Sequence, residues 1–388
     1  MPETLSEFGP ARRTLLTGTA ATVVTGCSAA GRRPSVGTGP AQPDAERSPA
    51  PSPFRQSGVV DPPPLRVRVL AFDLDPGLRG GPGAHRLRRL FAEWTAYGRR
   101  DERDGRSAAP AVAGASPVTV TVGIGPRTPA LLGVRAPALL AELPAFPGDR
   151  LQPRRCGGDV LVQVCGDSAT AVASAGQKLT RLAAGVLRAR WSQPGHLPPH
   201  RPGETPRNLF GFKDGTINPT HTESERWVWV GEGPDENGTY LVVRRIHMDT
   251  PAFEALPTRR QEAVIGRTRA EGAPLGHHEE HREVDLFDKS PEGRYVLPVD
   301  AHVRQAHSRL DRGARMLRRG YSYDNGPQDR GLLFLACMND PALFVRVQER
   351  LAVKDALSRF VEHRGSALAY VLPGPGPTGG LGDALFET

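Results

Sequence analysis

Cysteine and long apolar runs are both scarce in this chain. Four cysteines among 388 residues are too few for a disulfide scaffold, and their spacing excludes a four-cysteine zinc module. No apolar run reaches the ~18 residues of a membrane-spanning helix, which excludes an integral membrane protein. The chain is 38% hydrophobic and 24% charged, so most of it is expected to fold. At this length we expect two domain-sized units, or one domain built twice.

Lysine is nearly absent. Only four of the fifty basic residues are lysines, and the formal net charge is +8. Acidic residues are interspersed among the arginines, and the sequence contains no basic stripe or nucleic-acid-binding motif. The positive charge is therefore a compositional property of the whole chain, and we expect no nucleic-acid partner.

The first residues resemble an export signal. Arg12 and Arg13 precede a short, weakly apolar run, which is the organisation of a bacterial twin-arginine signal. The run ends in Val-Thr-Gly before Cys27, similar to the box at which lipoproteins are cleaved and lipidated. The alternative is a signal whose cysteine is incidental. We predict a signal over residues 1–27 and an extracytoplasmic protein, either secreted or held at the cell surface, with membrane contact only through a lipid anchor.

Residues 28–64 are rich in proline, with nine prolines among glycine, serine and alanine. Such a composition cannot bury a core, and it favours an extended, disordered linker. We therefore expect the folded part to begin at residue 65.

The remaining sequence predicts an α+β fold. In the first half, residues 65–200, we predict strands over 65–75, 118–124 and 159–164, and helices over 84–98 and 168–190. This order favours a ferredoxin-like sandwich. In the second half, residues 201–388, a loose repeat of this plan predicts strands over 239–247, 332–338 and 367–372, and a helix over 341–351. We therefore predict two related ferredoxin-like halves.

A carboxylate stands out in the segment 206–219. Glycines flank Phe212-Lys213-Asp214, so the backbone can turn tightly and place Asp214 at the wall of a cavity. The apolar neighbours of Asp214 favour burial, and a buried carboxylate is a candidate functional group. The alternative is a surface Asp-Gly turn.

Histidines and arginines follow further along the chain. His302 lies in the segment 299–307, and a lone histidine is more often structural than a ligand. His277, His278 and His281 lie among three glutamates, in what the pattern indicates is a solvated loop, without a regular element to orient them for a metal.

Three motifs together resemble the dye-decolorising haem peroxidases. They are Gly-Phe-Lys-Asp-Gly around Asp214, Asp-Ala-His-Val-Arg around His302, and Leu-Arg-Arg-Gly-Tyr around Arg318. They occur in the family's order, and shorter matches extend from about residue 58 to the end of the chain. The twin-arginine signal is similar to the exported branch of that family, which includes deferrochelatase/peroxidase proteins.

The resemblance implies one haem b per chain, held in the second half, in a peroxidase that reduces hydrogen peroxide and oxidises dyes or other organic reductants. His302 would be the axial ligand of the iron, and Asp355 the carboxylate behind it. Asp214 and Arg318 would be the catalytic residues on the opposite, distal face. The alternative function is iron release from haem or porphyrin handling, with iron-uptake components as partners.

The resemblance implies three further contacts with the haem. Gly215 and Thr216 would pack near its edge, and Arg309 near a propionate. The family's Asn-Pro-Arg reads His307-Ser308-Arg309 here, which leaves the propionate contacts open. His307 is the next candidate if His302 is not the ligand, and the short spacing from His302 leaves Arg319 as an alternative to Arg318.

Four aromatic residues are candidates for carrying electrons from bulky reductants. The pattern places Trp227 and Trp229 on one face of a strand, and Tyr321 and Tyr323 lie just beyond Arg318. Ordinary core packing is the favoured interpretation for each of them.

Overall fold

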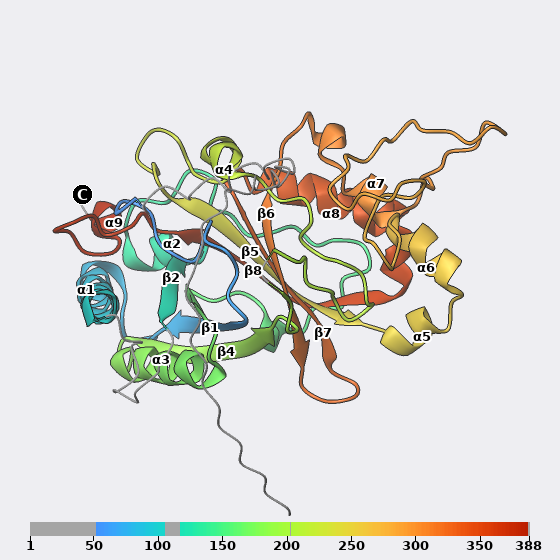
Figure 1. Ribbon diagram of the computed structural model, residues 1–388. Coiled ribbons are helices and arrows are strands. Elements are labelled where there is room, and N and C mark those ends of the chain that lie inside the picture. Colours follow the sequence, from blue (N-terminus) through green and yellow to red (C-terminus); the bar gives the residue numbers. More distant parts are fainter. Residues whose placement is uncertain (1–51, 105–116, 202, 387–388) are drawn as a thin grey trace, which may run out of the picture. The chain divides into compact units, whose positions relative to one another are not determined.

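The computed structural model describes residues 52–104, 117–201 and 203–386 (Figure 1). The predicted signal over residues 1–27, with Arg12, Arg13 and Cys27, and the linker up to residue 51 lie outside the described residues. Within the described part, no helix combines the length and the apolar character needed to cross a membrane.

The first half contains four antiparallel strands with two long helices. The strand order is β4-β1-β3-β2. The elements are β1 (Arg66–Leu74), α1 (Gly80–Asp104), β2 (Val118–Ile124), α2 (Thr128–Leu132), a 3-10 turn η1 (Pro153–Arg155), β3 (Val160–Gly166), α3 (Ala169–Leu182) and β4 (Leu187–His196).

The second half repeats this plan. Its strand order is β8-β5-β7-β6, so in both halves the fourth strand is followed by the first, third and second. The elements are α4 (His221–Trp227), β5 (Thr239–Met248), α5 (Thr250–Glu254), α6 (Thr258–Ile265), α7 (His302–Gln305), η2 (Ser308–Asp311), β6 (Leu317–Asp324), β7 (Arg330–Met338), α8 (Ala342–Lys354), η3 (Ala356–Arg359), β8 (Val361–Val371) and α9 (Asp383–Phe386). The predicted fold class, two related ferredoxin-like halves, is confirmed.

The two sheets join into one closed barrel. β2 pairs with β8 at Gly123 and Ile124, and β4 pairs with β6 where His196 lies opposite Ser322. The barrel interior is mainly apolar, with Val67, Leu161 and Leu335 among its buried residues. Helices α1 and α3 lie beside the first sheet, and α5 to α8 lie together in the second half (Figure 1).

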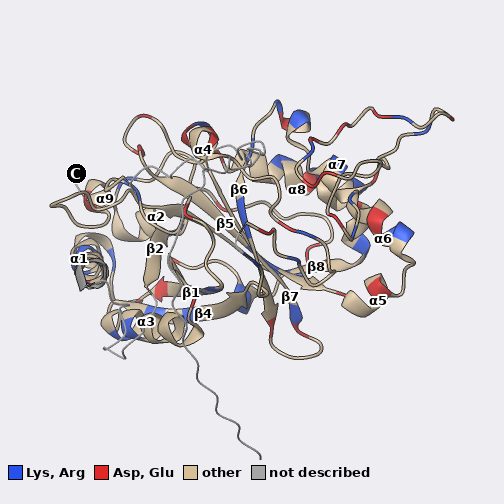
Figure 2. Cartoon of the chain, viewed as in Figure 1, with Lys and Arg blue, Asp and Glu red and all other residues tan. Residues whose placement is uncertain are grey.

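Local sequence explains the best-predicted elements. Every residue of β3 is buried, which accounts for its mainly apolar sequence, broken by Gln163, because both faces of this strand are covered. In α1, Leu87, Leu90, Phe91 and Trp94 are all buried, and their spacing puts them on one face of the helix. Figure 2 shows acidic and basic residues interspersed over both halves.

Two strands differ from the expectation. The helix predicted over 168–190 ends at Leu182, because the chain turns at Gly185, whose φ is +77°, and then continues as β4. The segment around Arg318 is also a strand, β6. β4 owes its structure to pairing with β1, which is distant in sequence, whereas β6 pairs along its length with β7, the next strand of the chain.

The linker also ends earlier than residue 64. Gln56 Nε2 donates to the carbonyl oxygens of Val122 and Leu372, at 2.7 and 2.8 Å, and Val59 is 1% exposed. Residues 56–59 therefore pack on the folded body. The linker expected over 28–64 is therefore too long at its carboxyl end. A proline-rich composition does not reveal that individual residues such as Gln56 and Val59 pack on the barrel.

Candidate active site

His302 and Asp355 form a hydrogen-bonded pair. The Nδ1 atom of His302 lies 2.7 Å from Oδ2 of Asp355. The other carboxylate oxygen accepts a hydrogen bond from the backbone N–H of Leu357, at 2.9 Å, so Asp355 also caps the turn η3. The carboxylate is thereby held at both oxygens, and it orients the imidazole so that Nε2 points away from it. A histidine held in this way is typical of a metal ligand.

The pKa of His302 reflects the charged groups around its imidazole. Burial alone would lower the pKa of His302, but the charge and the hydrogen bond of Asp355 outweigh burial and raise it. Arg318 opposes this rise and Asp214 adds to it. The two predicted distal residues are therefore close enough to His302 for both of their charges to act on the imidazole.

The approach of α6 fixes the backbone around His302. Gly266 ends α6 with φ +94°, and a Cβ atom there would lie 2.4 Å from Cγ2 of Val303 and 2.7 Å from Cδ1 of Leu297. Only glycine allows this close contact in this backbone conformation. From the other side, the N–H of Ala356 donates to the carbonyl of Asp300 at 2.9 Å. The start of α7 is thus held against both α6 and the end of α8.

Asp214 lies over Gly320 of β6. A Cβ atom at Gly320 would lie 3.2 Å from Oδ2 of Asp214, so the absence of a side chain there leaves room for the carboxylate. The backbone N–H of Asp214 donates to the carbonyl of Pro206 at 2.9 Å, and the buried Phe210 and Phe212 anchor the segment. Asp214 is half-buried, and its carboxylate accepts no hydrogen bond from the described residues. It is therefore neither the buried group nor the surface turn that its sequence suggested.

Arg318 and Arg319 lie on opposite faces of β6. Arg318 is on the same face as Gly320, and its Nη2 donates to the carbonyl of Ile217 at 2.7 Å. Its backbone is tied to Asn218 by two hydrogen bonds of 2.9 Å. Arg319 is 3% exposed and points to the barrel interior, where its guanidinium donates to the carbonyl of Asp61. The geometry therefore places Arg318, and not Arg319, on the face of Asp214.

Lys213, Glu280 and Arg267 border this site, although none of them was predicted to be a site residue. Glu280 forms an ion pair with Lys213 and accepts a hydrogen bond of 3.2 Å from the hydroxyl of Thr216. Arg267 is 6% exposed, and the charge of Arg318 contributes, after burial, to lowering its pKa. No periodicity reveals these contacts, because they join a loop near residue 280 to one near residue 213.

Gly215, Thr216, Arg309 and His307 are the remaining residues for which a haem contact was predicted. Gly215 adopts φ +97°, next to Thr216. Arg309 is exposed, with its guanidinium 5.9 Å from the centre of the Phe287 ring. His307 Nδ1 accepts from the backbone N–H of Arg309 at 3.2 Å. Burial lowers the pKa of His307; the charge of Glu283 opposes this, and the charges of nearby arginines add to it. No carboxylate of the described residues is hydrogen-bonded to His307, so its geometry suits a ligand less well than that of His302.

The candidate aromatic residues are mostly core residues. Tyr321 and Tyr323 are fully buried, and burial raises the pKa of Tyr323 to about 12. The expectation that Trp227 and Trp229 share a strand face is wrong, because Trp227 is the last residue of α4. Trp229 is 2% exposed, and the Arg226 guanidinium lies 4.4 Å from the centre of the Trp227 ring.

Comparisons with known proteins agree with this architecture. Residues 56–197 match the family model for the N-terminal part of Dyp-type peroxidases, and residues 205–375 match the model for the C-terminal part. A dye-decolorizing peroxidase of Thermobifida fusca is 38% identical over 360 residues, which cover 86% of this chain and 84% of that protein. A deferrochelatase of Yersinia pseudotuberculosis is 37% identical over 283 residues, which cover 66% of this chain and 64% of that protein.

Solved structures show the same similarity. A DyP-type peroxidase from Cellulomonas bogoriensis has a TM-score of 0.79 at 36% identity, covering 86% of this chain and 97% of that chain. Ferric DtpA from Streptomyces lividans has a TM-score of 0.79 at 34% identity, covering 86% of this chain and 96% of that chain. The chain therefore belongs to the Dyp-type peroxidase family. It is a haem-dependent peroxidase that acts on hydrogen peroxide.

The residues present fit a haem. Within the described residues, no group of three or more His, Cys, Asp or Glu side chains is placed to hold a metal ion. A single histidine with a carboxylate behind it suits an iron whose other ligands come from a porphyrin. The carboxylate of Asp214 accepts no hydrogen bond from the described residues, so it can act as a proton acceptor, and the guanidinium of Arg318 can act as a hydrogen-bond donor. The charges of both side chains act on His302.

Proposed function

We propose that the chain is a haem b peroxidase of dye-decolorising type, with one haem per chain, which oxidises dyes or other organic reductants outside the cytoplasm. The observation that carries the proposal is the pairing of His302 with Asp355, at 2.7 Å, within reach of the charges of Asp214 and Arg318. In this proposal His302 holds the haem iron, which supplies the redox chemistry when the haem is bound.

Asp214 is proposed to move the proton. Hydrogen peroxide must lose a proton from one oxygen and receive one on the other as the O–O bond breaks. The carboxylate of Asp214 is half-buried and accepts no hydrogen bond from the described residues, so it is available as the proton acceptor. It then returns the proton to the departing oxygen, directly or through water.

Arg318 is proposed to stabilise the negative charge on the peroxide oxygens. Its backbone is tied to Asn218 and its side chain to Ile217, so the guanidinium is held before peroxide arrives. A fixed cation stabilises developing charge without the cost of reorganisation. Gly215 and Thr216 border the haem edge in this proposal, and Arg309 lies near a propionate.

The absorption spectrum of purified protein tests the proposal. We expect a Soret band whose intensity corresponds to one haem per chain, and a change in that band within seconds of adding hydrogen peroxide. Oxidation of an added dye must then depend on peroxide. A protein that contains no haem after expression with a haem supply would contradict the proposal.

Release of iron from haem is the second candidate function, supported by the relatives that are named deferrochelatases. Iron-uptake components would then be its partners. Both activities are measured on the same holoprotein, as peroxide-dependent dye turnover and as iron-free protoporphyrin. Protoporphyrin formation without dye turnover would favour this second function.

Export by the twin-arginine route is proposed from the sequence alone. We expect replacement of Arg12 and Arg13 by lysines to trap the precursor in the cytoplasm. If Cys27 carries a lipid anchor, Cys27→Ser releases exported protein from the membrane fraction. Wild-type protein that is wholly soluble outside the cell would contradict the anchor and leave export intact.

A further inference from the structure

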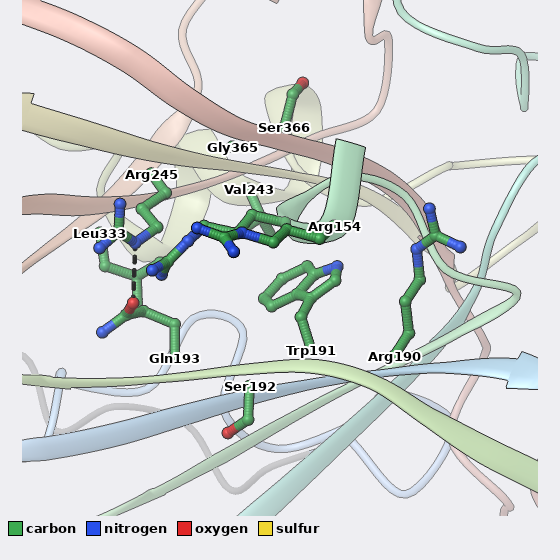
Figure 3. Close-up of a pocket in the computed structure, with 11 residues that line it drawn as sticks. Arg154, Arg190, Trp191, Ser192, Gln193, Val243, Arg245, Leu333, Gly365 and Ser366 are labelled. Carbon is green, nitrogen blue, oxygen red and sulfur yellow. Dashed lines mark hydrogen bonds between the residues drawn. The ribbon is translucent and has the colours of Figure 1, made fainter. Parts of the chain in front are cut away.

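A cleft of about 330 Å³ opens at the barrel, among residues of β4, β5, β7, β8 and the turn η1. This volume is at the lower end of the range typical of small-molecule sites. None of its eleven lining residues belongs to the proposed haem site. In Figure 3, the indole of Trp191 lies between Arg190 and Arg245.

The cleft is strongly basic. Arg154, Arg155, Arg190 and Arg245 line it, and no aspartate or glutamate is among the lining residues. Asp73 pairs with Arg190 at 2.9 Å, and Asp329 pairs with both Arg155 and Arg245. The side chain of Arg154 has no ion-pair partner in the described part of the chain. The positive charges of the four lining arginines therefore outnumber the negative charges of Asp73 and Asp329.

Arg245 is incompletely satisfied. Its side chain is 4% exposed, its Nε donates to Gln193 at 2.8 Å, and its Nη2 donates to Asp329. Its Nη1 is buried without a hydrogen-bond partner. A buried guanidinium donor without an acceptor is unfavourable, and an anion in the cleft would supply that acceptor.

Arg155 lies close enough to Arg245 and Arg154 for their positive charges to act on it. Burial, followed by the charge of Arg245, lowers the pKa of Arg155. An anion placed between these guanidinium groups would relieve the repulsion. Guanidinium groups bind the planar oxygens of carboxylates, and likewise sulfonate oxygens, through paired hydrogen bonds.

Trp191 adds an aromatic surface to the basic one. Its Nε1 donates to the carbonyl of Gly157 at 2.8 Å, which fixes the ring, and the residue is half-buried. A fixed indole face presents a flat ligand with a stacking surface at little entropic cost.

We propose that this cleft is a second ligand site, separate from the haem site, which binds an aromatic carboxylate or sulfonate. The ring of the ligand packs on Trp191, and its anionic group reaches Arg154 and the free Nη1 of Arg245.

Calorimetric titration of the holoprotein with naphthalenesulfonate tests the proposal. We expect one site for naphthalenesulfonate. Sulfate and neutral naphthol are each expected to bind at least about tenfold more weakly, because sulfate lacks the aromatic ring and naphthol lacks the anionic group. Arg154→Glu and Trp191→Ala are each expected to weaken binding about tenfold. Arg181→Glu, which makes the same charge change at an exposed position of α3, serves as the control and is expected to bind as the wild type does.

Several results would overturn the proposal. Absence of naphthalenesulfonate binding to the wild type would do so, as would equal binding by wild type, Arg154→Glu and Trp191→Ala. Sulfate that binds as tightly as naphthalenesulfonate would show a plain anion site and would overturn the aromatic part. The Soret band is expected to be the same in the cleft variants and the wild type, which separates this test from the test of the haem site.

Discussion

The Nδ1 atom of His302 and Oδ2 of Asp355 lie 2.7 Å apart, and the carboxylate is the more deeply buried of the two side chains, with 4% exposed against 31%. Asp355 is fixed by its position at the end of α8, where it also caps η3. The carboxylate therefore belongs to the scaffold, and the imidazole is the part that faces a ligand. The first two predictions separate these roles.

His302→Ala is expected to give folded protein that holds little haem, because the proposed bond from His302 is the only one between the chain and the iron. The measurement is the Soret absorbance per mole of protein, with circular dichroism to verify folding. His307→Ala is the matched control and is expected to retain haem. Full haem occupancy in His302→Ala, with loss in His307→Ala, would move the assignment to His307.

Asp355→Asn is expected to weaken haem binding by about 10–100-fold, the usual effect of losing a partner behind a metal ligand. Asparagine keeps an oxygen for the Leu357 cap, so the fold is expected to persist. The neutral amide also makes the imidazole a weaker donor, and we expect the ferric/ferrous reduction potential to rise. Spectroelectrochemistry measures this potential, which a purely structural role of Asp355 would leave unchanged.

Asp214→Asn is expected to keep the haem and to slow its reaction with peroxide by about 10²–10⁴-fold, the usual contribution of general acid–base catalysis. The change removes the proton acceptor while preserving size and polarity. Stopped-flow absorbance with excess peroxide measures the rate. A rate equal to the wild type would remove Asp214 from the proposed mechanism.

Arg318→Leu is expected to slow the same reaction by about 10²–10³-fold, the usual loss for one electrostatic donor. We expect Arg318→Leu to be the more impaired of the two, near the upper end of its range, with Asp214→Asn near the lower end of its own, because water partly replaces a carboxylate as a proton carrier. Arg319→Leu is the control, since Arg319 lies on the opposite face of β6. Slowing in Arg319→Leu alone would reverse this assignment.

Glu280→Gln tests the ion pair beside the site. Burial opposes ionisation of Glu280, but its hydrogen bonds with Lys213, Thr205 and Thr216 and the charge of Lys213 prevail, so its pKa is lowered from 4.5. A lowered carboxyl pKa stabilises the fold above the unfolded pKa, and this stabilisation is lost as pH falls through the folded pKa. We expect a loss of about 1–2 kcal/mol at neutral pH. Thermal unfolding of both proteins is measured between roughly pH 7 and pH 3, which spans the titration of a carboxylate. We expect the difference in stability to shrink below about pH 4.5.

The elements that the sequence predicted well are those whose partners are local or whose faces are uniform. The buried β3 and the amphipathic α1 are examples, because a covered strand and a one-sided helix each leave a regular apolar pattern. β4 was missed as a strand for the opposite reason. β4 contains Pro194 and Gly195 and is largely exposed, and it is a strand because it pairs with β1 along its length.

The residues of the candidate site likewise divide into those that the sequence predicted and those that it did not. Asp214, His302 and Arg318 were found through short motifs, and Asp355 through its position in the chain. Glu280 and Arg267 were not found, because nothing in their own segments records that they lie beside Lys213 and Arg318. The choice between Arg318 and Arg319 was likewise open, since adjacent residues of a strand point to opposite faces and only the sheet decides which face meets Asp214.

The sequence by itself determined the fold class, the repeat of two α+β halves and the family, because each of these is carried by residue types in a fixed order. The residues of the haem site stay a prediction. Only the tertiary structure decided that the two sheets close into one barrel and that Arg318 shares the face of Asp214. It also brought Trp191 and four arginines from three separate segments into one cleft. These features depend on contacts between segments that are distant in sequence. Such contacts are determined by the pairing of strands in the folded protein rather than by local sequence.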